Sequence, residues 1–247
     1  MPVPVVVYGR EREPWIELGW PGLDPAEPSL DIFSFDHSGS VISCGGTDPI
    51  GNRFREATRA IQIVQAWTTT KRPKAAIVHF DQPSTGNSDV IALNERRALQ
   101  RLSASLRVPP DAKGSSDLEP SLAVAERLAE KYRDHAVRFT IFSDFSLTDD
   151  DPDEMFTRLA AFPGQVHAVV LNATPPPDLA AENITITRIS HDDPPGSLAA
   201  AVHRSLTATR RGRRLSVRHA DRTQPSIPPL SPARPSKVER PTRKGHR

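Results

Sequence analysis

The sequence predicts a doubly wound α/β fold, in which helices cover both faces of a mostly parallel sheet. Short apolar runs of strand length alternate along the chain with longer segments whose apolar residues recur at helical spacing. The predicted strands are apolar at successive positions, so both of their faces are expected to be buried, as they are in parallel sheets. We expect this domain to span residues 30–208 and to contain no internal repeat.

The predicted strands are short runs rich in large apolar residues. The last of them alternates isoleucine with threonine, and one short run between two turn-rich segments is expected to form an edge strand. In chain order, the predicted strands span residues 30–36, 75–80, 89–93, 137–143, 165–171 and 183–190.

The predicted helices carry apolar residues every three to four positions. Asn94 and Ser197 are expected to cap the second and fifth helices. The acidic residues 149–151, followed by Pro152, place carboxylates at the positive end of the fourth helix. In chain order, the helices are expected at about 51–69, 95–106, 115–132, 152–162 and 197–206.

Residues 1–29 are expected to form an N-terminal extension that packs on the domain. Its apolar run at 3–8 is of strand length, and Trp15 and Trp20 are expected to cover one edge or face of the domain. We expect neither a signal peptide nor a membrane-spanning segment, because no apolar stretch approaches the roughly 18–20 residues that span a bilayer. A single cysteine, Cys44, excludes an intrachain disulfide, so we expect a cytoplasmic protein without membrane association.

Residues 209–247 are rich in arginine, proline and serine, and we expect them to form a disordered basic tail. Two interpretations of its charge stay open: a solvated tail, which we favour, or salt-dependent contacts with nucleic-acid phosphates. The proline-rich run at 225–235 could also serve as an extended docking segment. The arginines concerned are Arg210, Arg211, Arg213, Arg214 and Arg218.

Polar side chains gather where two predicted strands end and where one predicted helix begins. Asp36, Ser38 and Ser40 follow the first strand, Ser116 precedes the third helix, and Asp144 follows the strand at 137–143. In a parallel sheet these ends meet at one edge, which is where open α/β sheets bind ligands. Carboxylate and hydroxyl oxygens are hard donors that suit a small divalent cation such as Mg²⁺. The sequence therefore predicts a metal site at this edge.

In this order, the five residues resemble the metal-ion-dependent adhesion site (MIDAS) of von Willebrand factor A (VWA) domains. The resemblance covers about residues 30–205 and implies a Rossmann-like fold that holds Mg²⁺ or Mn²⁺ and binds partners. It implies that Ser38 and Ser40 coordinate the ion directly, whereas Asp36 and Asp144 act directly or through water. In the family, a carboxylate of the partner often fills the open coordination position.

Two positions depart from the family pattern. Ser116 stands where threonine is common, which keeps the hydroxyl but fixes its χ1 less firmly. His37 occupies the variable position, and we expect its ring to point away from the ion. Each motif also has an ordinary interpretation. Ser116 could cap the helix together with Glu119, Asp144 could be a turn acid, and the loop that Asp36 opens could be a plain Asx turn.

Other polar residues are expected to be structural. His79, His135 and His167 lack the spacing of metal ligands, so we interpret them as structural or exposed. Residues 149–151 are expected to start a helix rather than to form a second metal site.

The resemblance implies a binding module without enzymatic activity. Cytoplasmic bacterial members of the family commonly act as scaffolds, often beside an AAA+ ATPase, so we expect a protein partner. One alternative is a metal-dependent hydrolase or phosphotransferase that uses Asp36 or Ser38. No evident catalytic base and no glycine-rich phosphate loop with a lysine support it. Another alternative is a nucleic-acid-associated protein that acts through its tail.

Overall fold

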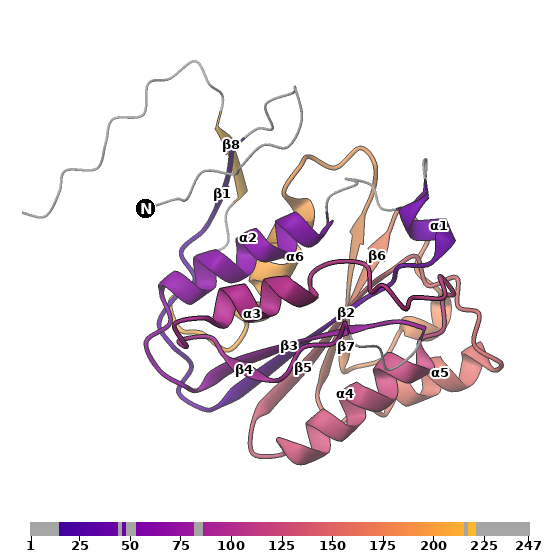
Figure 1. The fold of residues 1–247 in the computed structure, drawn as a ribbon, viewed down its shortest axis with the longest axis horizontal. Helices are drawn as coiled ribbons and strands as arrows, with labels where there is room; N and C mark the ends of the chain where they lie inside the picture. The colour runs from indigo at the N-terminus through magenta and orange to yellow at the C-terminus, as the bar shows by residue number, and fades with distance from the viewer. Residues whose placement is uncertain (1–14, 44–45, 48–52, 82–85, 215–216, 221–247) are drawn as a thin grey trace, which may run out of the picture.

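A computed structural model of the chain describes residues 15–43, 46–47, 53–81, 86–214 and 217–220. The predicted strand at 3–8, residues 51–52 of the first predicted helix and residues 221–247 of the predicted tail lie outside the described residues. The main sheet has six strands in the order β4-β3-β2-β5-β6-β7 (Figure 1). In chain order these are β2 (Ser29–Phe35), β3 (Pro73–His79), β4 (Ile91–Ala92), β5 (Ala136–Ser143), β6 (Gln165–Leu171) and β7 (Ile184–Ile189).

The sheet is parallel except where the short edge strand β4 pairs with β3. Strand β2 lies inside it, with β3 on one side and β5 on the other. The chain therefore continues from β2 to one side of the sheet and later returns to the other side. The loops that follow β2 and β5 diverge at this switch point, which is the usual ligand position in open α/β sheets.

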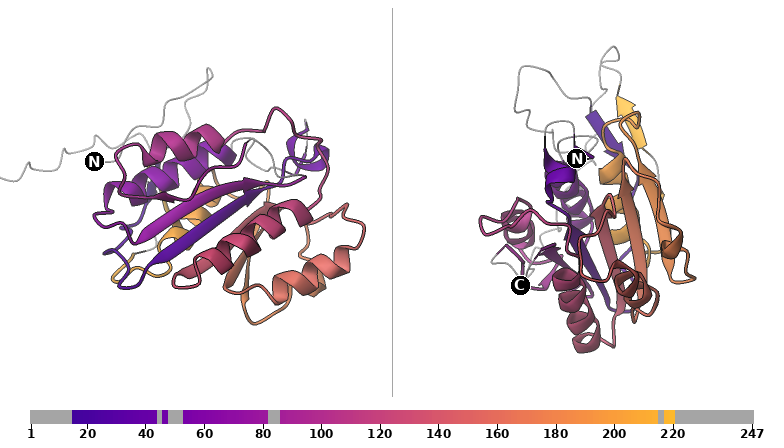
Figure 2. Two further views of the ribbon diagram at one scale, coloured as in Figure 1. Left: turned by 60° about the horizontal axis from the view of Figure 1, so that its bottom comes forward. Right: turned by 90° about the vertical axis from the view of Figure 1, so that its right-hand side faces the viewer.

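Helices cover both faces of the sheet (Figure 1; Figure 2). Phe33 and Phe35 of β2 pack with α2, α3 and α6 on one face, whereas Leu30 and Ile32 pack with α4 and α5 on the other. This alternation follows from the period of two in a strand. The helices are α1 (Gly39–Ile42), α2 (Arg53–Ala66), α3 (Ala98–Ser105), α4 (Glu119–Lys131), α5 (Pro152–Ala160) and α6 (Ser197–Leu206), with a 3₁₀ turn at Pro177–Leu179.

The predicted fold class is confirmed, since this is a doubly wound, mostly parallel sheet flanked by helices. Two predicted helix caps are wrong. Helix α3 begins four residues after Asn94, whose side-chain amide donates instead to the Thr69 carbonyl at 3.3 Å. Helix α6 takes no cap from Ser197, because the Glu56 carboxylate of α2 accepts the amides of Gly196 and Ala199 at 2.6 and 3.0 Å.

The predicted start of the tail at residue 209 is also wrong. Within the described residues, the chain from Thr209 to Arg214 packs against the segment after β1 (Trp15–Leu18). The Leu23 amide donates to the Arg211 carbonyl at 3.0 Å, and the Arg214 amide donates to the Trp20 carbonyl at 2.9 Å. Strand β8 (Val217–Ala220) then pairs antiparallel with β1. The residues that precede and follow the main domain are therefore joined to each other.

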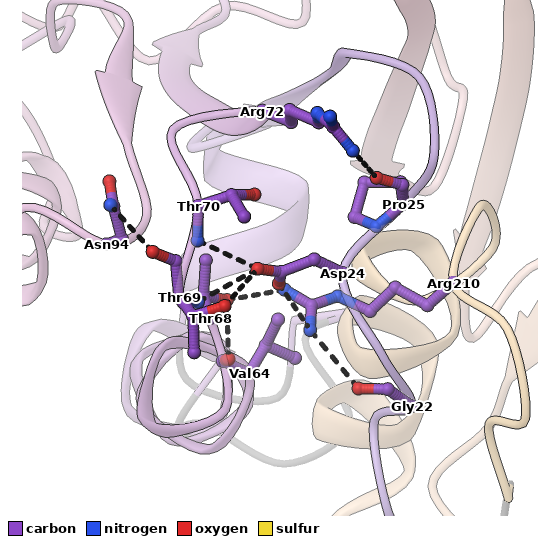
Figure 3. Close-up of polar contacts among 10 residues, drawn as sticks. All are labelled: Gly22, Asp24, Pro25, Val64, Thr68, Thr69, Thr70, Arg72, Asn94 and Arg210. Atoms are coloured by element: carbon purple, nitrogen blue, oxygen red, sulfur yellow. Dashed lines mark hydrogen bonds and ion pairs between the residues drawn. The ribbon is translucent and has the colours of Figure 1, made fainter.

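Arg210 explains why this segment is ordered (Figure 3). Its side chain is fully buried, lies 3.3 Å from the Asp24 carboxylate and donates to the Thr68 hydroxyl. Asp24 in turn accepts the amides of Thr69 and Thr70 at 2.9 and 2.8 Å. A buried, paired arginine is not available to nucleic-acid phosphates, so the alternative of phosphate contacts does not apply to Arg210.

None of the helices in the described part of the chain combines the length and apolar character that a bilayer-spanning helix requires.

Candidate metal site

Asp36 lies immediately after β2, in a loop that bends its side chain back onto the backbone. It is fully buried, and one carboxylate oxygen accepts the Ser38 amide at 2.8 Å. The other oxygen accepts the Ser143 hydroxyl at 2.6 Å. The Ser38 and Ser40 hydroxyls lie 3.0 Å apart, and Ser40 is exposed to solvent. This loop thus gathers one carboxylate and two hydroxyls at the carboxyl end of a central strand.

Asp144 lies beside this loop because β5 is the parallel neighbour of β2. Phe35 pairs with Phe142 in the register of the two strands, which brings the residues after them together. Asp144 is almost completely buried, and its carboxylate accepts the Ser146 amide at 3.0 Å and the Thr47 hydroxyl at 3.2 Å.

Ser116 lies in the loop before α4, and this loop touches the other two. The Gly39 amide donates to the Gly114 carbonyl at 3.2 Å, which joins the Ser116 loop to the Asp36 loop. The Ser116 amide donates to the Thr148 hydroxyl at 3.0 Å, which joins it to the loop after β5. Ser116 itself is buried. The structure therefore brings the loops of all five predicted ligands to one edge of the sheet.

Ser116 does not form the capping pair with Glu119 that was the alternative interpretation of this residue. The amides of Leu118 and Glu119 donate to the Asp149 carboxylate at 2.9 and 2.8 Å, so a residue from the loop after β5 caps α4. Asp151 caps α5 by accepting the Glu154 amide at 3.0 Å. The acidic residues 149–151 therefore serve helix starts, as predicted, but those of two different helices.

Solved structures with the same arrangement of strands and helices are known. One is a von Willebrand factor type A protein from Catenulispora acidiphila, with a TM-score of 0.53 and 12% identity. Another is proximal thread matrix protein 1 from the mussel byssus, with a TM-score of 0.52 and 14% identity. This chain has the VWA fold. The alignments cover 82% and 83% of the chain but 51% of each of those proteins.

No family model matches the sequence, and no curated protein matches it. At these identities, the comparisons show the fold of the VWA-like domain and nothing about its ligands. The predicted VWA resemblance is therefore confirmed at the level of fold, and the chemistry of the site rests on the side chains described above.

The two carboxylates of the site lie close enough to repel each other. Burial raises the pKa of Asp36 most, and the neighbouring Asp144 charge raises it further, against hydrogen bonds from Ser143 and Ser38 that lower it. Among the described residues, the partners of Asp36 and Asp144 are hydroxyl and amide groups rather than arginine or lysine. A divalent cation would relieve this repulsion, and the all-oxygen donor set fits Mg²⁺ or Mn²⁺.

Other metal chemistries fit the VWA-like domain less well. Within the described ranges, no three acidic, histidine or cysteine side chains gather as metal ligands. Two of the histidines that were expected to be structural make polar contacts inside the fold. His79 bonds to the Ser105 carbonyl at 2.8 Å, and His167 lies between the hydroxyls of Ser205 and Thr187. Burial lowers the pKa of His79 and His167 to about 4 in each case.

Sequence reasoning missed three hydroxyl residues that support the site. Thr47 donates to Asp144, Ser143 donates to Asp36, and Thr148 accepts the Ser116 amide. Ser143 could have been found from the sequence, because it ends a predicted strand next to Asp144. Thr47 and Thr148 carry no such signal, since their importance depends on contacts between loops that are distant along the chain.

Proposed function

We propose that this VWA-like domain is a metal-dependent protein-binding module. Asp36, Ser38, Ser40, Ser116 and Asp144 would hold Mg²⁺ or Mn²⁺, and the ion would engage an acidic group on a partner protein. The observation that carries this proposal is a pair of adjacent, buried carboxylates that are surrounded by hydroxyl and amide groups. Uncompensated buried charges are costly, so the arrangement favours a cation from outside the chain.

The residues themselves favour binding of a further anion. Two carboxylates can at most balance the charge of one divalent ion, and serine hydroxyls are neutral donors. Octahedral Mg²⁺ takes six ligands, so ligation by these five side chains would leave room for an additional oxygen ligand. Ser40 is exposed, so this side of the loop is open to a partner. A glutamate or aspartate side chain has the charge and the hard oxygen that such a position requires.

A catalytic role has weaker support. The hydroxyl partner described for Ser38 is Ser40, rather than a histidine or lysine that could accept its proton. We therefore propose a module without enzymatic activity. Following the family resemblance, we place it in the cytoplasm as a scaffold whose partner is another complex subunit, with an AAA+ ATPase as one candidate.

The test is isothermal titration of the purified chain with Mn²⁺, together with thermal unfolding in Mg²⁺. Ion at about one hundred times its Kd should stabilise the protein by about 2.7 kcal/mol. For a chain of this size, that corresponds to a rise in Tm of roughly 5–10 °C. Asp36→Asn should abolish both the heat of binding and the rise.

Asp31→Asn provides the matched control. Asp31 is a buried aspartate near the amino end of β2, whereas Asp36 follows the carboxyl end of the same strand. It should keep the metal response. Failure of wild-type protein to bind Mn²⁺ at millimolar concentration would contradict the proposal. With a partner in hand, its capture should disappear in EDTA and in Asp36→Asn, but not in Asp31→Asn.

A further inference from the structure

Asp81 follows β3 at the same edge of the sheet as the candidate metal site, and its backbone is unusual. Its φ angle is +77°, in the left-handed region that residues other than glycine rarely adopt. Its side chain is almost fully buried. A strained, buried aspartate persists where surrounding contacts hold it, and such strain is concentrated at functional sites.

The contacts of Asp81 bracket Ser116. One carboxylate oxygen accepts the backbone amides of Lys113 and Gly114, the latter at 2.7 Å. On the other side of Ser116, the Asp81 backbone amide donates to the Asp117 carbonyl at 2.8 Å. Asp81 thus holds the loop at two points, one before and one after the predicted ligand.

Asp81 also reaches the loop that carries the other hydroxyls. The carboxylate oxygen that accepts the two amides lies 3.4 Å from His37 Nε2, and His37 stands between Asp36 and Ser38. Gly114, which Asp81 holds, accepts the Gly39 amide. One buried carboxylate therefore touches both loops that must approach each other for Ser38 and Ser116 to share an ion.

We infer that Asp81 is a positioning residue for the metal site, which sets the distance between the Ser116 loop and the Asp36 loop. This inference rests on the proposed function. Asp81 does so through hydrogen bonds to backbone amides and not as a ligand. Without the Asp81 carboxylate, the Ser116 loop would have to become ordered when the metal binds. The entropy lost in this ordering would weaken the affinity for the metal.

Asp24 offers a comparison at the opposite edge of the sheet (Figure 3). One of its carboxylate oxygens accepts two successive backbone amides, of Thr69 and Thr70, as Asp81 does with Lys113 and Gly114. The two aspartates make the same kind of contact, but only Asp81 lies beside the predicted ligands. Substitution of Asp24 therefore shows the general effect of losing a carboxylate that accepts two amides. Substitution of Asp81 shows the additional effect on the metal site.

The experiment measures Mn²⁺ affinity by isothermal titration in full-length Asp81→Gly, Asp81→Asn and Asp24→Ala. Glycine adopts positive φ without strain, so Asp81→Gly removes the side chain while the backbone can keep its conformation. It should bind Mn²⁺ about 10-fold more weakly and show faster amide hydrogen exchange at residues 113–117. Asparagine tolerates positive φ and can place one oxygen against both amides, so Asp81→Asn should restore most of the affinity. Asp24→Ala should lose stability and keep wild-type affinity.

Two outcomes would overturn the inference in different ways. If wild-type protein binds Mn²⁺ and Asp81→Gly binds it equally well, Asp81 does not position the site, although the proposed function stands. If Asp81→Asn is as weak as Asp81→Gly while both remain folded by circular dichroism, the hydrogen bonds are not the cause. Absence of Mn²⁺ binding by the wild-type protein would instead remove the proposed function and this inference with it.

Discussion

The two edges of the sheet use aspartates in opposite ways. At the amino edge, the Asp24 carboxylate lies 3.3 Å from Arg210 and accepts the amides of Thr69 and Thr70 at 2.9 and 2.8 Å. At the carboxyl edge, Asp36 and Asp144 have hydroxyl and amide partners in the described part of the chain, and no such pairing with arginine.

The difference shows at which edge the carboxylate charge is balanced by other residues of this chain. Removing one partner of a buried, hydrogen-bonded ion pair is strongly destabilising, whereas adjacent like charges destabilise the folded state by their presence. The amino edge therefore works as a structural joint between the two ends of the domain. The carboxyl edge keeps an unfavourable arrangement that an added cation would relieve.

Backbone strain is distributed in the same way. The described residues other than glycine with positive φ are Asp81, Phe145 and Asn172, and each lies shortly after the carboxyl end of a strand. These positions cost about 1–3 kcal/mol each when the backbone lies outside its favoured regions. Strain at the edge that carries the candidate site, and not at the paired edge, agrees with a functional role for that edge.

Among the predictions from this comparison, substitution of Arg210 is expected to have the largest effect on stability. Arg210→Met should lower the free energy of unfolding by about 3–5 kcal/mol, because it removes the fully buried guanidinium and leaves the mostly covered Asp24 carboxylate without its cation. Urea denaturation measures this change. Arg211→Met is the control, since Arg211 is exposed and should change stability by less than about 0.5 kcal/mol. Equal effects of the two substitutions would show that the amino edge is not held by this pair.

A second prediction concerns the contribution of Asp31, near the amino edge, to the pH dependence of stability. Burial raises the pKa of Asp31 from 3.8 to about 7, although Arg138 and Arg210 lower it. The folded state therefore holds this proton more tightly than the unfolded state does. Asp31 lowers stability progressively as pH rises from about 4 to about 7, and its effect is constant above that range.

Comparison of the wild type with Asp31→Asn isolates this effect. The stability of the variant relative to the wild type should rise with pH in that range, by at most about 1.4 kcal/mol per pH unit. His79, His167 and His203, whose pKa values burial lowers to about 4, act in the opposite direction. They are present in both proteins and cancel in the difference, which urea denaturation at several pH values measures. A pH-independent difference would mean that Asp31 ionises normally.

The smallest expected effect lies within the carboxyl edge itself. Ser116→Ala should weaken Mn²⁺ binding about 10-fold, or about 1.4 kcal/mol, because it removes one hydroxyl ligand. Ser116→Thr should bind as well as the wild type, since it keeps the hydroxyl. Ser115→Ala is the control, as the Ser115 hydroxyl donates to Asp117 and is not a predicted ligand. Isothermal titration would exclude Ser116 as a ligand if alanine and threonine behave alike.

Sequence reasoning succeeded where a local pattern carries the signal. The predicted strand at 30–36 corresponds to β2 at Ser29–Phe35, and Asp151, one residue before Pro152, caps the acidic start of α5. It failed where the partner is remote. Asp149 caps α4 and Glu56 caps α6. In the sequence, each carboxylate is far from the amides whose hydrogen bonds it accepts.

By itself, the sequence determined the alternation of strands and helices, the strand ends and the oxygen-bearing residues that follow them. These depend on the periods of 2 and 3.6 residues and on turn chemistry, which act over a few neighbouring positions. Only the tertiary structure decided that Asp81 holds the Ser116 loop, that Thr47 supports Asp144 and that Arg210 is buried. Such contacts join residues far apart in the chain, and they exist only after the sheet has placed its loops side by side.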